Sequence, residues 1–140
     1  MSLRSVSRIS WKIRLVVEIL TTYVRVRWEF RRKDLPETIE ALRTGRRALA
    51  GTSQDPREDF RLGLRLGDAV GRTLRPLPFD SRCLVRSLVL TRLLERRGIS
   101  SQVVIGVRPE PTFAAHAWVE REGVPLLPSQ EPEYQRLVVL

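Results

Sequence analysis

The sequence predicts a single α+β domain, in which helices precede a small antiparallel sheet. Apolar residues recur at helical spacing up to Arg97, whereas β-branched and aromatic residues dominate after Gly98. The length of 140 residues suits one hydrophobic core. One cysteine and one histidine exclude an internal disulfide and supply too few ligands for a structural zinc site. We therefore expect neither a metal nor a cofactor.

Two helices are expected in the first 50 residues. Residues 9–31 form the longer one, and their apolar side chains follow two faces, one with Ile13, Val16, Val17, Leu20 and Val24, the other with Leu15, Ile19, Tyr23, Val26 and Phe30. Two apolar faces indicate packing on both sides, against the rest of the protein and against a partner or lipid. A second helix is expected over residues 34–47, because Asp34 can cap it and Glu37 completes the capping box.

Two further helices follow a loop at residues 51–54. The third begins at Asp55, a capping residue, with Pro56 at the first helical position, and ends before the proline-rich stretch 76–78. The fourth covers residues 80–97, beginning at Asp80 or Ser81 and ending at Gly98. Its apolar residues cover nearly the full circumference, which predicts a helix in the middle of the structure.

The remaining chain is expected to form the sheet. Residues 102–108 and 113–121 are predicted strands, and Glu122-Gly123 is a plausible two-residue hairpin turn after the second. A third strand from Val124 would be an edge strand or a broken one, because prolines follow it. Residues 137–140 could add a short fourth strand.

Positive charge is concentrated at the start of the chain. The net charge is +9, and residues 1–33 carry nine basic groups against only Glu18 and Glu29. Such an excess suits a membrane surface, a nucleic acid or an acidic protein face, and a solvated helix rim explains it equally well. The absence of a recognisable nucleic-acid motif argues against nucleic acid.

The same charges bear on the expected location. They interrupt the early apolar stretch, so neither a secretory signal nor a transmembrane helix is expected. The sequence predicts a soluble cytoplasmic protein, with peripheral membrane contact through residues 1–33 left open.

Cys83 and His116 are the candidate catalytic residues. Cys83 falls in the first turn of the expected fourth helix, where free N–H groups and the helix dipole favour a thiolate. His116 falls within a strand, on one face with Trp118 and Glu120. A thiol on a helix and a base on a packed strand is the arrangement that papain-type chemistry requires. The plainer interpretations are a small buried cysteine and a structural histidine.

Two motifs extend this pattern. The run Cys-Leu-Val-Arg-Ser-Leu at residues 83–88 and the run Ala-His-Ala-Trp-Val-Glu at residues 115–120, with the stretches between them, resemble the transglutaminase-like peptidases of lasso-peptide biosynthesis, also called the microcin-processing protein C-terminal domain. The resemblance covers about residues 74–128. It implies a reduced papain/transglutaminase-like core, with the catalytic helix packed on a small antiparallel sheet. It also implies a cysteine peptidase that removes the leader peptide from a ribosomally made lasso-type precursor.

By this resemblance Cys83 is the nucleophile and His116 the base. Pro128 stands where the family commonly has an acidic residue that orients the imidazole. We expect Gln130 to take that role, with Glu131 as the charged alternative. Glu120 shares the His116 face but lies about 13 Å along the strand, too far for that role. Trp118 is a candidate wall of the substrate cleft, or plain core.

The resemblance also implies partners and a division of the chain. The partners would be the precursor peptide, a leader-binding protein and an ATP-dependent cyclase. Residues 1–50 would be an N-terminal helical segment, and residues 51–140 the peptidase core. Because Pro128 replaces the acidic residue, the alternative is a catalytically weak or inactive protein of the same fold that binds a leader peptide or partner.

Overall fold

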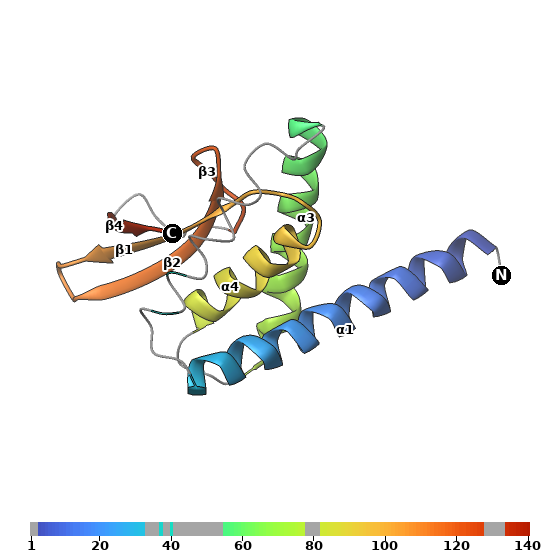
Figure 1. Ribbon diagram of the computed structural model, residues 1–140, viewed down its shortest axis with the longest axis horizontal. Coiled ribbons are helices and arrows are strands. Elements are labelled where there is room, and N and C mark those ends of the chain that lie inside the picture. The colour runs from blue at the N-terminus through green and yellow to red at the C-terminus, as the bar shows by residue number, and fades with distance from the viewer. Residues whose placement is uncertain (1–2, 33–36, 38–39, 41–54, 78–81, 128–133) are drawn as a thin grey trace.

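The computed structural model describes residues 3–32, 37, 40, 55–77, 82–127 and 134–140. Within them the chain forms three helices followed by one four-stranded sheet, which confirms the α+β prediction (Figure 1). In chain order these elements are α1 (Leu3–Arg32), α3 (Pro56–Leu74), α4 (Arg82–Glu95), β1 (Gln102–Arg108), β2 (Ala114–Arg121), β3 (Val124–Pro125) and β4 (Gln135–Val139). The predicted helix 34–47 and the start of the helix expected from residue 80 lie largely outside the described residues.

Local signals in the sequence set the ends of the described helices. The Asp55 carboxylate accepts hydrogen bonds from the backbone N–H of Arg57 at 2.9 Å and of Glu58 at 3.4 Å, so it caps α3. Gly98 has a φ of +70°, the left-handed conformation that glycine adopts most readily, and it follows the last turn of α4. The predicted start of α3 is confirmed, whereas α4 ends at Glu95, two residues before the predicted Arg97, and Gly98 closes the turn that follows.

The sheet is antiparallel with strand order β3-β2-β1-β4. Glu122 and Gly123 both have positive φ, +51° and +80°, as a two-residue type I′ hairpin turn requires, so the predicted turn is confirmed. β3 is two residues long and lies at the sheet edge, as the prolines predicted. The pairing of β1 with β4 shifts by one residue between Ile105 and Gly106, which marks a bulge.

The helix α4 lies at the centre of the fold. It packs against α1, α3, β1 and β2, and Figure 1 shows it between α1 and the sheet. Val89, Leu90, Leu93 and Leu94 are completely buried in the core. Burying each large apolar side chain stabilises the fold by about 1.5–3 kcal/mol, so α4 contributes a large share of the core energy. Its apolar circumference correctly predicted this position.

Candidate active site

Cys83 is the second residue of α4 and is half-buried. The first turn of a helix holds backbone N–H groups without an intrahelical partner, and the described part of this turn contains no acidic residue. Arg86 lies one turn further along α4, and its Nε is buried with no hydrogen-bond partner among the described residues. Cys83 therefore lies at the N-terminal end of a helix, the position that the sequence analysis expected for a nucleophile.

His116 lies within β2 between two aromatic rings. Its imidazole stacks on Trp118, with ring centroids 6.0 Å apart and planes 20° apart, and it contacts Tyr134 at 5.4 Å. Burial lowers the pKa of His116 from its ordinary value of 6.5, because a cationic imidazole loses water of hydration there. The ring is therefore neutral at neutral pH and can accept a proton.

Gly106 makes room for this aromatic group. It pairs with His116 across the β1–β2 ladder, and a Cβ atom at this position would lie 2.9 Å from the Trp118 ring and 3.0 Å from the Tyr134 Cβ. A side chain here would force both aromatic residues away from β1. Glycine thus allows the rings of Trp118 and Tyr134 to close around the imidazole, at the position where the bulge also begins.

Glu120 holds the Trp118 ring in place. The Trp118 Nε1–H donates to Glu120 Oε1 at 2.7 Å, and an Arg136 guanidinium N–H donates to the same oxygen at 2.9 Å. The Glu120 side chain is only 3% exposed, and its Oε2 has no hydrogen-bond partner among the described residues. The carboxylate contacts the neighbour of the imidazole rather than the imidazole itself. The sequence analysis considered Glu120 only as a direct partner of His116 and missed its hydrogen bond to Trp118. The signal was there, because the i, i+2, i+4 spacing places His116, Trp118 and Glu120 on one face of the strand.

The structure pairs His116 with Trp118 and packs α4, which carries Cys83, against β2. Along β2, Val119 belongs to the core that includes α4 residues, whereas His116 points with Trp118 and Glu120 to the alternate face. No hydrogen bond joins Cys83 and His116, both of which are among the described residues. Gln130 and Pro128 lie outside the described residues, so the roles expected at those positions stay predictions. The described residues hold no cluster of three or more His, Cys, Asp or Glu side chains that could bind a metal.

Known proteins resemble this chain at two levels, a curated relative over a short stretch and a family over most of the sequence. Microcin J25-processing protein McjB of Escherichia coli is 49% identical over 45 residues, a stretch that covers 32% of this chain and 21% of that protein. No solved structure matches the chain significantly. The model of the transglutaminase-like superfamily matches residues 20–140, a range that contains Cys83, His116 and the whole sheet. The chain therefore belongs to the transglutaminase-like superfamily.

Proposed function

We propose that the protein is a cysteine peptidase that removes the leader peptide from a ribosomally made lasso-type precursor. The carrying observation is the superfamily match, whose range contains both Cys83 in the first turn of α4 and the partly desolvated imidazole of His116 on β2. In the described structure that imidazole lies on the face of β2 opposite the core face, so the proposal requires His116 to reach the thiol from there. Cys83 supplies the nucleophile and His116 the base in this proposal.

In the proposed reaction the His116 imidazole takes the proton of the Cys83 thiol, and the thiolate sulfur attacks the scissile carbonyl carbon. The tetrahedral intermediate collapses as the imidazolium gives its proton to the departing amine, which leaves a thioester. Water then attacks the thioester with His116 as base, releasing the leader acid and restoring the thiol. The Cys83 backbone N–H, at the N-terminal end of α4, is a candidate donor to the oxyanion.

The aromatic residues around His116 would hold the base in one orientation. Trp118 stacks on the imidazole and is itself fixed by the hydrogen bond from its indole N–H to Glu120. Tyr134 contacts the imidazole as well. Trp118 and Tyr134 would also limit the access of water to the imidazole, which supports its role as a neutral base.

The choice of substrate rests on similarity. The relative from Escherichia coli is named for processing microcin J25, and the local identity of 49% supports a related substrate class for this chain. The match spans about one fifth of that relative, so the substrate, the leader-binding protein and the ATP-dependent cyclase expected as partners are part of the proposal.

Cleavage of a precursor peptide by the full chain tests the proposal. A lasso-type precursor peptide is incubated with the chain and a leader-binding protein, and products are followed by mass spectrometry. We expect leader release by the unchanged chain and none by Cys83→Ala, with circular dichroism confirming that the variant folds. Cleavage by Cys83→Ala would remove the thiol from the mechanism. A folded wild-type chain that binds the precursor without cleaving it would establish the binding protein instead.

Alkylation gives a second, substrate-free test of the pair. Because Cys83 is the only cysteine, iodoacetamide reports on one thiol. We expect His116→Gln to slow alkylation at neutral pH by about tenfold or more, because the thiolate loses its proton acceptor. The control is Arg61→Gln, an exposed change on α3 that should leave the rate unchanged. An unchanged rate in His116→Gln would contradict the proposed contact between thiol and imidazole.

A further inference from the structure

The outer side of α1 carries an apolar stripe that nothing in the described structure covers. Leu15, Ile19 and Val26 pack into the core, which leaves the opposite side of the helix facing outward. The residues of this outer stripe recur every three or four positions and are each between 38% and 63% exposed: Ile9, Ile13, Val16, Val17, Leu20, Val24 and Trp28. Monomeric soluble proteins seldom expose a contiguous apolar surface of this length without a binding role.

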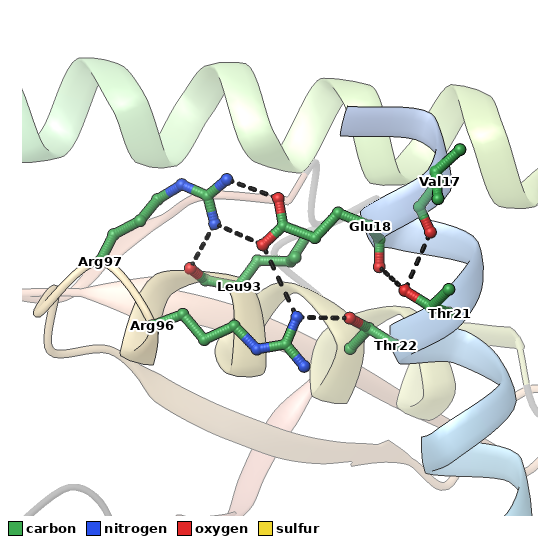
Figure 2. A network of polar contacts seen from close by, with 7 residues as sticks. All are labelled: Val17, Glu18, Thr21, Thr22, Leu93, Arg96 and Arg97. Atoms are coloured by element: carbon green, nitrogen blue, oxygen red, sulfur yellow. Dashed lines mark hydrogen bonds and ion pairs between the residues drawn. The ribbon is translucent and has the colours of Figure 1, made fainter. Parts of the chain in front are cut away.

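The acidic and basic residues of α1 lie on different sides of the helix: the acidic ones face the rest of the protein, and exposed basic ones face solvent. The helix has only two acidic residues, Glu18 and Glu29; Glu18 binds arginines of the turn that follows α4, and Glu29 binds an arginine of α4 itself. The Glu18 carboxylate binds the Arg97 guanidinium at 2.8 Å and approaches that of Arg96 at 3.6 Å, while Arg96 also donates to the Thr22 hydroxyl (Figure 2). Glu29 binds Arg92 at 3.3 Å.

What remains on the solvent side of α1 is positive. Exposed basic side chains flank the outer stripe along its length: Lys12, Arg14, Arg25, Arg31 and Arg32. The Arg32 guanidinium also lies over the Trp28 ring, 3.8 Å from its centroid. A second copy of this face would bring like charges together, so self-association through the outer stripe is disfavoured. An apolar strip with tryptophans and a purely cationic rim suits an anionic lipid surface.

A groove extends this surface from α1 onto α3. It encloses about 510 Å³, and its walls include Trp11, Val16 and Lys12 of α1 with Arg65 and Arg72 of α3. Asp68 also lines it and pairs with Arg72 at 3.0 Å, so the remaining charge at the groove is positive. Trp11 is 56% exposed at the rim.

The shape of the molecule leaves this side accessible. The N-terminal half of α1 projects beyond α3 and α4 (Figure 1). No helix among the described residues is long and apolar enough to cross a membrane. We propose that the outer stripe of α1, with its basic rim, binds the surface of an anionic bilayer, with the helix lying in the plane of the lipid headgroups. This proposal is independent of catalysis.

Vesicle co-sedimentation of the full chain tests it. Vesicles of phosphatidylcholine with phosphatidylglycerol should bind the protein at low salt, pure phosphatidylcholine vesicles should bind it weakly, and added salt should weaken the first interaction. The tryptophan emission should shift to the blue on binding, because Trp11 and Trp28 are exposed whereas Trp118 is already buried. No binding to the anionic vesicles at low salt would overturn the proposal.

A matched pair of variants identifies the surface. Val24→Glu places a charge in the outer stripe, and Leu64→Glu makes an equivalent change at an exposed apolar residue of α3; the two side chains are 63% and 42% exposed, so both variants should fold. We expect Val24→Glu to weaken vesicle binding by about tenfold and Leu64→Glu to leave it unchanged. Equal losses in both variants would contradict the proposal.

Further measurements test whether the basic residues contribute to vesicle binding and whether a nucleic acid or a second copy of the chain binds the outer stripe instead. Arg25→Gln should weaken binding several-fold, whereas Arg61→Gln on α3 should not. Binding to an oligonucleotide in the absence of vesicle binding would assign the surface to nucleic acid. A dimer that Val24→Glu dissociates, seen by analytical ultracentrifugation without vesicle binding, would assign it to a second copy. Either result would overturn the lipid proposal.

Discussion

Helices α1 and α4 are both apolar on more than one face, yet the protein covers them very differently. α4 contacts α1, α3, β1 and β2, and its Val89, Leu90, Leu93 and Leu94 are completely buried. α1 is buried along one side only, and Val24 on its opposite side is 63% exposed. The comparison teaches that apolar residues on several faces of a helix predict burial of those faces. Which faces are actually buried depends on the elements that the fold packs against the helix.

The largest expected effect separates the two helices directly. Leu90→Ala in α4 should lower the free energy of unfolding by about 2–5 kcal/mol, because it removes buried methyl groups and leaves a cavity. Val24→Ala in the outer stripe should change it by less than about 0.5 kcal/mol. Urea denaturation of the two variants measures both values. Equal losses would mean that the outer stripe is covered in solution.

A change of intermediate size is expected at Gly106, beside His116 and the two aromatic residues Trp118 and Tyr134 that contact it. Gly106→Ala should lower the free energy of unfolding by about 1–3 kcal/mol, because the added Cβ would meet the Trp118 ring at 2.9 Å. Gly71→Ala is the matched control, since a Cβ there meets no atom within 4 Å and alanine favours the helix. Denaturation curves for the two variants should therefore move in opposite directions.

The ion pairs of Glu18 on α1 with the turn that follows α4 should give a smaller effect on stability, with a distinct pH dependence. A hydrogen bond from Arg97 lowers the pKa of Glu18 from its ordinary value of 4.5. The stabilisation is thus fully present above pH 4.5 and is lost as the pH falls through the lowered folded-state pKa. Glu18→Gln should cost about 1 kcal/mol at neutral pH and flatten the acid limb of stability. Thermal melts across this range, with a steep limb persisting in Glu18→Gln, would contradict the assignment.

The smallest expected change in stability comes from the protonation of His116. Since it is the only histidine, its imidazole proton resonances can be followed by NMR without competing signals. We expect a midpoint below 6.5, because burial disfavours the cation. The unfolded chain binds this proton more readily, so stability is full above pH 6.5 and declines as the pH falls through the lower folded value. His116→Gln should remove that decline, and a midpoint at or above 6.5 would contradict the burial seen here.

Much of the fold could be predicted because its signals are local. Asp55 caps α3, Gly98 closes the turn after α4 and Glu122-Gly123 turns the hairpin through backbone preferences that each residue carries by itself. The sequence left open which apolar side of α1 would be buried. The buried side is the one on which Glu29 meets Arg92 of α4 and Glu18 meets Arg97 just after it, contacts between residues more than 60 positions apart along the chain.

The candidate site divides in the same way. Cys83 and His116 stand out as single residues of their kinds, and alternation along the strand places Trp118 beside His116. Tyr134 could not be predicted, because it reaches the imidazole only through the pairing of β4 with β1 and the bulge at Gly106. The expected role of Gln130 and the division of the chain at residue 50 depend on stretches outside the described residues and stay predictions.

The two ion pairs of α1 also fix its direction. Glu18 and Glu29 are eleven residues apart, about 16 Å along a helix axis; Glu29 is paired with Arg92 of α4, and Glu18 with Arg97 in the turn after it. Two separated anchor points define a line, so α1 cannot swivel about a single joint. A membrane surface bound to the outer stripe would therefore have a fixed position and orientation relative to α4, the helix that carries Cys83.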